Sequence, residues 1–294
     1  MKILVTGANG FIGRHTVDYL IKNNYSDIYG MIRTVTSNEN THTKYVKADL
    51  SGNDLCRALS SSCGSLDAIV HVAACLSKDN RDPELIQVNC HGMQSLIETA
   101  HQLGCKRFVY ISGIPVIGKP IFHPITEGHP TVPGTTYHAS KLFGEHLLLL
   151  SDNNAINPII LRLPSPVGKG MNSKAILPTF INNCIAGRGI VLFGKGSRRQ
   201  NYIDVRDICI AIELALQSRV CGVYNIANRR TISNYELAEI CKRLTNSSAP
   251  VVFNGQDDPE EGIDWNISIE KAFRDLCFDP RYSIYDTIQS MINE

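Results

Sequence analysis

Gly7-Ala8-Asn9-Gly10-Phe11-Ile12-Gly13 directly follows a short apolar run at residues 3–5. Three glycines spaced in this way between a strand and a helix suit a loop that holds a pyrophosphate. The first glycine permits a tight turn, the second lets a phosphate approach the backbone, and the third allows close helix–strand packing. Unpaired N–H groups at the helix start favour the negative charge of the phosphate. The stretch therefore predicts dinucleotide binding through Gly7, Gly10, Phe11, Ile12 and Gly13.

Outward from this loop, the first half of the chain alternates apolar runs with amphipathic stretches. Strands are expected at 3–5, 28–32, 45–46, 68–70 and 108–111, and helices at 12–22 and within 83–103. Near-continuous apolar strands separated by helices indicate a parallel sheet buried on both faces. The pattern therefore predicts an α/β fold with a doubly wound parallel sheet.

Glycine and proline interrupt the sequence more often after about Pro164, and short helices are expected at 205–217 and 234–244. Such broken runs are typical of insertions that follow the strands of a sheet. We therefore expect residues 1–163 to form a dinucleotide-binding core. Residues 164–294 are expected to form mainly a smaller C-terminal substrate-binding lobe, with some segments returning to the core.

The composition excludes several classes of protein. Among 294 residues, 43% are hydrophobic and 19% charged, with a formal net charge of +1, which argues against a disordered chain and against nucleic acid as a partner. Ten cysteines without a CxxC pair, and histidines without HxxxH spacing, give no metal site. No apolar run approaches the roughly 18 to 20 residues of a membrane span. We expect a soluble, cytoplasmic protein that acts on a small molecule.

The end of the second expected strand bears on the choice of dinucleotide. An NAD site usually places a carboxylate there to bind the ribose 2′-hydroxyl, but this chain has none between that strand and Glu39. Arg33 can instead pair with a 2′-phosphate, and Arg14 is placed to assist. The alternative is that Arg33 is an ordinary surface arginine. NADP is therefore favoured, with NAD as the alternative.

Tyr137-His138-Ala139-Ser140-Lys141 places a tyrosine and a lysine on one helical face. A phenol with a pKa near 10 is a poor acid or base at neutral pH, and a neighbouring ammonium lowers that pKa. The same lysine can bind a nicotinamide ribose. Such a pair is common by chance, but behind a glycine loop it predicts hydride-transfer chemistry with Tyr137 as the acid/base and Lys141 as its partner.

With both motifs, the sequence resembles the extended short-chain dehydrogenase/reductase family, specifically its NAD(P)-dependent sugar epimerase/dehydratase group, over essentially the whole chain. The resemblance implies a Rossmann fold, a homodimer, and an enzyme that acts on a secondary alcohol or ketone of a sugar or nucleotide sugar. It also implies that several further residues lie beside the cofactor, namely Asp49 and Leu50 near the adenine, Ala73 after the fourth strand, and Pro164 at the nicotinamide end. Asn89 matches an asparagine of the family on the following helix.

Two departures from the family pattern affect the expected chemistry. The family's SSxxVYG is replaced by residues 112–118, so Gly113 stands where a catalytic Ser or Thr is usual. Either Ser112 takes over that role or the role is vacant, and a one-residue shift in a strand reverses the side-chain face. In the family's GSxxRDF, Gln200 replaces the arginine that binds the substrate phosphate. Either Arg198 and Arg199 compensate, or they are exposed surface arginines.

The sequence therefore predicts an NAD(P)-dependent oxidoreductase or epimerase with Tyr137, Lys141 and Ser112 as catalytic residues and Gln200 as a substrate-binding residue. Two alternatives remain. One is an NADPH-dependent ketone reductase with a non-nucleotide substrate, which Arg33 favours. The other is a non-catalytic sensor that binds the cofactor, which Gly113 favours.

Overall fold

The computed structural model describes residues 1–34, 43–151 and 155–293. Its centre is a seven-stranded sheet in the order β11-β6-β5-β4-β1-β2-β3, in which every neighbouring pair is parallel. The strands are β1 (Lys2–Thr6), β2 (Asp27–Ile32), β3 (Lys44–Lys47), β4 (Ala68–His71), β5 (Arg107–Gly113), β6 (Asn157–Leu163) and β11 (Gly222–Asn225). The doubly wound parallel sheet that the sequence predicts is confirmed.

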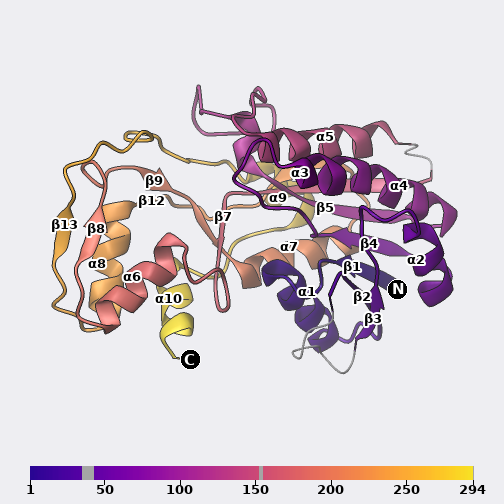
Figure 1. Ribbon diagram of the computed structural model, residues 1–294, viewed down its shortest axis with the longest axis horizontal. Helices are drawn as coiled ribbons and strands as arrows, with labels where there is room; N and C mark the ends of the chain where they lie inside the picture. Colours follow the sequence, from indigo (N-terminus) through magenta and orange to yellow (C-terminus); the bar gives the residue numbers. More distant parts are fainter. Residues whose placement is uncertain (35–42, 152–154, 294) are drawn as a thin grey trace.

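Helices cover both faces of this sheet (Figure 1). On one side lie α1 (Phe11–Lys22), α7 (Val205–Gln217) and α9 (Glu270–Leu276), and on the other α2 (Leu55–Cys63), α4 (Gly92–Gln102) and α5 (Thr136–Leu150). The strand residues alternate between the two cores. On β5, Val109 and Ile111 pack on the α1 and α7 side, whereas Phe108 and Tyr110 pack on the α4 and α5 side. Because both faces are buried, the strands read as continuous apolar runs.

The helix expected within residues 83–103 is divided into three parts. A short helix α3 (Pro83–Ile86) leads into a π-helical turn, η1 (Gln87–His91), which continues as α4. A π-turn inserts one extra residue per turn and re-aims the side chains around it, and such turns are frequent at functional sites. After β5 the chain forms a short 3-10 helix, η2 (Ile114–Ile117).

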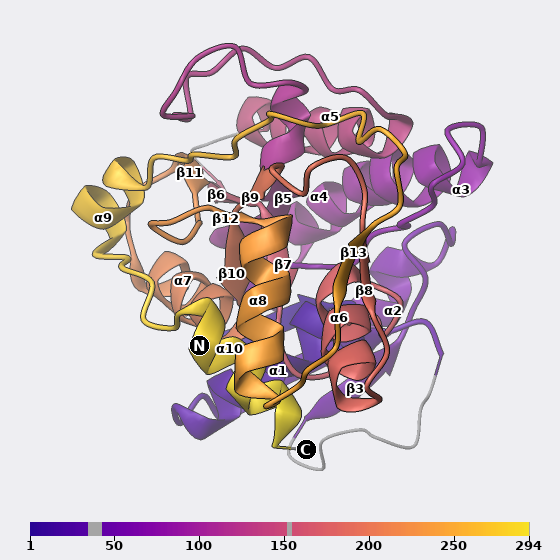
Figure 2. The same ribbon diagram turned by 90° about the vertical axis from the view of Figure 1, so that its left-hand side faces the viewer.

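The later part of the chain builds a smaller lobe beside the sheet, which faces the viewer in Figure 2. It contains three strand pairs: β7 (Ser165–Val167) with β10 (Tyr202–Asp204), β8 (Ile190–Leu192) with β13 (Val251–Phe253), and β9 (Arg199–Gln200) with β12 (Ile232–Ser233). Helices α6 (Ile176–Ile185), α8 (Asn234–Leu244) and α10 (Ile284–Ile292) supply a third apolar cluster. The helices predicted at 205–217 and 234–244 form with the same bounds.

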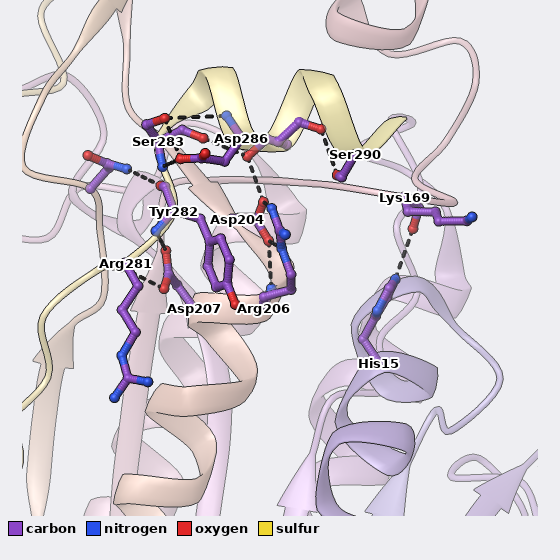
Figure 3. Close-up of polar contacts among 12 residues, drawn as sticks. His15, Lys169, Asp204, Arg206, Asp207, Arg281, Tyr282, Ser283, Asp286 and Ser290 are labelled. Atoms are coloured by element: carbon purple, nitrogen blue, oxygen red, sulfur yellow. Dashed lines mark hydrogen bonds and ion pairs between the residues drawn. The ribbon is translucent and has the colours of Figure 1, made fainter. Parts of the chain in front are cut away.

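A buried polar junction ties the start of α7 to the segment that leads into α10 (Figure 3). The carboxylate of Asp204 accepts a hydrogen bond from the Thr287 hydroxyl at 2.6 Å and pairs with Arg206 at 2.8 Å. Asp207 accepts the backbone N–H groups of Arg281 and Tyr282 at 2.8 and 3.1 Å. Since α7 packs on the sheet and α10 belongs to the lobe, this junction helps to set the position of the lobe.

Within the described residues, no helix is both long and apolar enough to cross a membrane.

Candidate active site

A cavity of about 820 Å³ lies at the carboxyl ends of β1, β2, β4, β5 and β6. The strand order reverses between β1 and β4, and open α/β sheets bind ligands at such a reversal. Most of the residues predicted for the site line this one cavity: Gly7, Gly10, Phe11, Ile12, Arg33, Asp49, Leu50, Ala73, Ser112, Tyr137, Lys141 and Pro164. Gly13, Arg14 and Gln200 are not among its lining residues.

The glycine loop turns tightly from β1 into α1. Gly7 has a positive φ of 65°, and a Cβ there would lie 2.9 Å from the Cα of Ala73, so only glycine fits. A Cβ on Gly13 would collide with the carbonyl of Gly7, which explains the third glycine although it does not line the cavity. The first turn of α1 has no capping side chain and no acidic residue. Its free N–H groups are therefore available to a phosphate.

Thr6 and His71 join the ends of β1 and β4 beneath this loop. The Thr6 hydroxyl oxygen accepts the backbone N–H groups of Val72 and Ala73, both at 3.1 Å, and lies 2.8 Å from Nδ1 of His71. With both of its lone pairs occupied, the hydroxyl donates to Nδ1, which places the imidazole proton on Nε2. Burial lowers the pKa of His71 to about 3. This neutral histidine is part of the scaffold that holds Ala73 against Gly7.

The far end of the cavity carries Arg33 and Asp49. The Asp49 carboxylate accepts the backbone N–H and the hydroxyl of Ser51 at 3.0 and 2.8 Å. These bonds, together with the charge of Arg33, lower the pKa of Asp49. Arg33 is exposed at the cavity wall.

Arg14 does not lie beside Arg33, in contrast to the assisting role that the sequence suggests. Its guanidinium donates to the carbonyl of Gly170 at 2.5 Å, while the neighbouring His15 contacts the carbonyl of Lys169 at 2.9 Å. Arg14 therefore bridges α1 to the loop after β7. The reason is that the Gly170 carbonyl supplies the guanidinium with a hydrogen bond within the protein, and Arg14 does not line the cavity.

Tyr137 and Lys141 both line the cavity from the first two turns of α5. The buried ammonium of Lys141 donates to the carbonyl of Ile111 at 2.8 Å and lies 4.8 Å from the centre of the Tyr110 ring. Burial lowers the pKa of Lys141 to about 8, with the charge of Glu145 acting in the opposite direction. The lysine is thus held by β5 at the edge of the site.

The pKa of Tyr137 differs from the expectation. Burial, followed by the proximity of the Cys75 thiol, raises the pKa of this phenol to about 12, whereas a lysine partner is expected to lower it. The difference follows from desolvation, which disfavours the phenolate. In the structure as it stands, Tyr137 keeps its proton at neutral pH.

Asn89 in the π-turn connects the cavity wall to α5. Its amide accepts the backbone N–H of Cys75 at 2.8 Å and donates to the carbonyl of Cys75 and to the Ser140 hydroxyl at 3.1 and 3.0 Å. Ser140 in turn donates to the carbonyl of Tyr137 at 2.7 Å. Asn89 therefore positions Cys75 relative to α5 by hydrogen bonds to Cys75 and Ser140.

Ser112 lines the cavity, but its hydroxyl donates to the Glu145 carboxylate at 2.5 Å. Arg162 completes this buried network through Nε and Nη2, the closest approach being 2.6 Å. The hydroxyl is therefore engaged on the α5 side of the sheet. The next residue, Gly113, has an extended backbone and offers the cavity no polar side chain.

The two arginines that precede Gln200 are paired with carboxylates. Arg198 binds Glu260 at 2.5 Å, and in the amide orientation that satisfies both side chains Gln200 accepts from Arg198 at 2.5 Å. Arg199 pairs with Glu236 at 3.1 Å and lines a separate cavity of about 590 Å³ between β12, α8 and α10. Neither arginine is left unpaired to replace the cation that Gln200 lacks.

Three residues of the site escaped the sequence predictions, namely Cys75, His138 and Glu145. His138 and Cys75 line the cavity, and Glu145 lies beneath it. Glu145 repeats the helical spacing of Tyr137 and Lys141, a signal present in the sequence, whereas nothing local marks the other two. Among the described residues, no cluster of three or more His, Cys, Asp or Glu side chains could hold a metal ion.

A family model described as the NAD dependent epimerase/dehydratase family matches residues 3–227. A putative UDP-glucose 4-epimerase of Methanocaldococcus jannaschii is 27% identical over 303 positions, covering 99% of this chain and 97% of that protein. A dTDP-glucose 4,6-dehydratase of Streptomyces niveus is 28% identical over 307 positions, covering 97% and 90%.

Among solved structures, a UDP-glucose 4-epimerase from Thermotoga maritima with UDP-glucose matches with a TM-score of 0.92. Its sequence is 23% identical, and the match covers 100% of this chain and 98% of that one. The shared fold and the family match confirm the resemblance inferred from the two motifs. The chain belongs to the NAD dependent epimerase/dehydratase family of enzymes.

Proposed function

We propose that this protein is an NAD-dependent epimerase that inverts a secondary alcohol of a nucleotide sugar. The observation that carries the proposal is that one cavity holds the glycine loop, the Tyr137–Lys141 pair and Pro164 together. The printed functions of the relatives, a UDP-glucose 4-epimerase and a dTDP-glucose 4,6-dehydratase, support a nucleotide sugar as the substrate class.

The residues of the site fit the dinucleotide. The uncapped first turn of α1 faces the cavity, and Gly7 keeps the loop close to Ala73 without an intervening side chain. When bound, NAD supplies the hydride acceptor and, in its oxidised form, a positive ring charge that lowers the pKa of a nearby phenol.

Tyr137 is the group that exchanges a proton with the substrate oxygen. Its phenol is half-buried and lines the cavity, where it can exchange a proton with a sugar hydroxyl. Lys141 donates to the carbonyl of Ile111 on β5 and contributes positive charge to the same end of the cavity. Since Ser112 donates to Glu145, we assign that serine to the support of α5 and not to the reaction.

The substrate phosphates need a donor other than the lobe arginines. Arg198 and Arg199 are neutralised by Glu260 and Glu236. We propose that Gln200 meets a nucleotide diphosphate as a neutral hydrogen-bonding side chain. Such a contact is weaker than a charge-assisted one, which predicts a modest affinity for the nucleotide part.

The ketone reductase remains the second candidate because Arg33 is an exposed cation at the cavity wall, which a 2′-phosphate could use as a partner. An epimerase returns its hydride and keeps its cofactor, whereas a reductase consumes NADPH. We take NAD as the cofactor, and the NADP preference indicated by Arg33 stays a prediction.

One experiment separates these functions. The purified protein is denatured to identify any bound dinucleotide, and the native protein is incubated with UDP- and dTDP-hexoses while epimers and free NADH or NADPH are followed. Interconversion of 4-epimers without net cofactor consumption supports the proposal. Stoichiometric NADPH consumption with a ketone supports the reductase. Firm cofactor binding without turnover of either substrate class supports the sensor.

We also propose that the chain forms the homodimer expected from the resemblance, through α4 and α5. Helix α5 leaves Phe143 and Leu150 exposed at 45% and 83%. A monomeric mass by light scattering would contradict this.

A further inference from the structure

The end of β5 gives the cavity wall Ser112, whose hydroxyl donates to Glu145, and Gly113, which has no side chain. Gly113 lines the cavity with an extended backbone, and a Cβ built there would meet nothing closer than Cδ of Pro115 at 3.5 Å. The adjacent polar groups are occupied, since Ser112 donates to Glu145 and Lys141 donates to Ile111. An oxygen at the reacting carbon therefore has room on this side but receives no hydrogen bond from β5.

His138 enters the same cavity from α5. It directly follows Tyr137, and the centres of the two rings are 5.3 Å apart with planes inclined by 60°. The ring of His138 therefore lies beside the ring of Tyr137, the proposed acid/base. Both residues line the same cavity, so a ligand in it is accessible to both side chains.

The imidazole is held in place by Thr135, the N-cap of α5. The Thr135 oxygen accepts the backbone N–H of His138 at 3.2 Å and lies 2.9 Å from Nδ1 of its ring. Burial lowers the pKa of His138, so the ring is neutral at pH 7. Because the Thr135 hydroxyl can donate to Nδ1, the neutral ring can carry its proton on Nε2. In the part of the chain that the structure describes, no hydrogen bond is formed by Nε2.

We propose that His138 is a further catalytic residue, whose Nε2–H donates a hydrogen bond to the same substrate oxygen that exchanges its proton with Tyr137. This donor polarises the ketone and stabilises the charge that develops on its oxygen. It thus does from α5 what a hydroxyl at position 113 would do from β5. The inference rests on the proposed epimerase function and extends it.

The test uses the full-length protein and the nucleotide sugar that the wild type turns over. His138→Phe keeps an aromatic ring but removes the donor, and His138→Gln keeps an N–H. We expect kcat of His138→Phe to fall about 10²- to 10³-fold, in line with the loss of one such donor, and His138→Gln to retain more. NADH affinity by fluorescence titration and the melting temperature should stay close to wild type, which shows that the variants are folded.

A second-site variant tests the specific role. A Cβ at position 113 meets no close neighbour, so both serine and alanine fit there. Gly113→Ser adds a hydroxyl to this part of the wall, and Gly113→Ala is the matched variant that adds only a methyl group. In the His138→Phe background, Gly113→Ser should restore kcat at least several-fold and Gly113→Ala should not. If His138 only supports α5, Gly113→Ser should restore kcat no better than Gly113→Ala does.

Three outcomes would overturn the proposal. A His138→Phe protein with kcat within twofold of wild type excludes the histidine from the reaction while leaving the epimerase function standing. Equal effects of serine and alanine at position 113 show that the two groups do not serve one oxygen. A wild type that is inactive on every nucleotide sugar overturns the proposed function itself, and the role of His138 in it.

Discussion

Ser112 and Glu145 are joined by a buried hydrogen bond of 2.5 Å that links β5 to α5. Arg162 from β6 binds the same carboxylate, so three elements that frame the active site share one network. The helix that carries Tyr137 and Lys141 is thereby fixed against the sheet. These bonds occupy the Ser112 hydroxyl even though the residue lines the cavity, which assigns it to the support of the site.

Ser112→Ala should therefore cost stability and leave the chemistry largely intact. Loss of a hydrogen bond to a buried carboxylate is expected to lower the free energy of unfolding by about 1.5–3 kcal/mol. Urea denaturation measures that loss, and kcat should remain within about threefold of wild type because no contact to the substrate is removed. A hundredfold loss of kcat in a folded variant would show instead that the serine reaches the substrate.

Tyr137→Phe should abolish proton exchange without affecting cofactor binding. The phenol contributes the acid/base group, and general acid–base catalysis is worth about 10²–10⁴ in rate. We expect kcat to fall by that factor, measured by epimer formation, while NADH titration gives an unchanged Kd. Near-normal turnover of this variant would rule out the mechanism.

His71 should make the fold sensitive to mild acid. Its pKa is about 3 in the folded protein and about 6.5 when unfolded, so the unfolded chain binds more protons between these values. Stability is complete above pH 6.5 and is lost as the pH falls toward 3, by about 2 kcal/mol between pH 6.5 and 5 for this one group.

The measurement compares urea unfolding of the wild type and His71→Asn at several pH values. The comparison is needed because Asp207 acts in the opposite sense. Burial raises the pKa of Asp207 to about 6, so this carboxyl lowers stability as the pH rises from about 4 to 6. If the difference in the free energy of unfolding between the wild type and His71→Asn does not change from pH 5 to 7, His71 is not the source of the acid sensitivity.

Arg33→Asp should change the choice between the two dinucleotides. Replacing a guanidinium at the cavity wall with a carboxylate removes a partner for a 2′-phosphate and introduces repulsion. We expect the ratio of the Kd values for NADPH and NADH to rise at least tenfold in fluorescence titrations. Arg14→Ala is the matched control, because Arg14 contacts Gly170. An unchanged ratio in Arg33→Asp would remove Arg33 from the cofactor site.

Gln200→Arg should strengthen binding of the nucleotide part of the substrate. A charge-assisted bond replaces a neutral one, which is worth about tenfold in affinity, and Glu260 is close enough to Arg198 to balance the added charge. Calorimetric titration with UDP measures the change, and Gln200→Glu should act in the opposite direction. Identical Kd values in both variants would place position 200 outside the substrate site.

The sequence by itself determined the fold class, the glycine loop and the tyrosine–lysine pair. These are local features, since Gly7 to Gly13 span one turn and Tyr137 and Lys141 lie one helical turn apart. The apolar strands were readable for a similar reason, because burial on both faces leaves continuous runs such as 108–111.

Tertiary structure decided which side chains reach the cavity. Strand alternation puts Ser112 on the same face as Tyr110, against α5, where Glu145 takes its hydroxyl. Arg14 was directed to Gly170 by a loop about 156 residues away in the chain, and burial set the pKa of Tyr137 opposite to the direction implied by Lys141. Each of these outcomes depends on distant segments packing together, because desolvation and hydrogen-bond partners are supplied across the fold and not by neighbours in sequence.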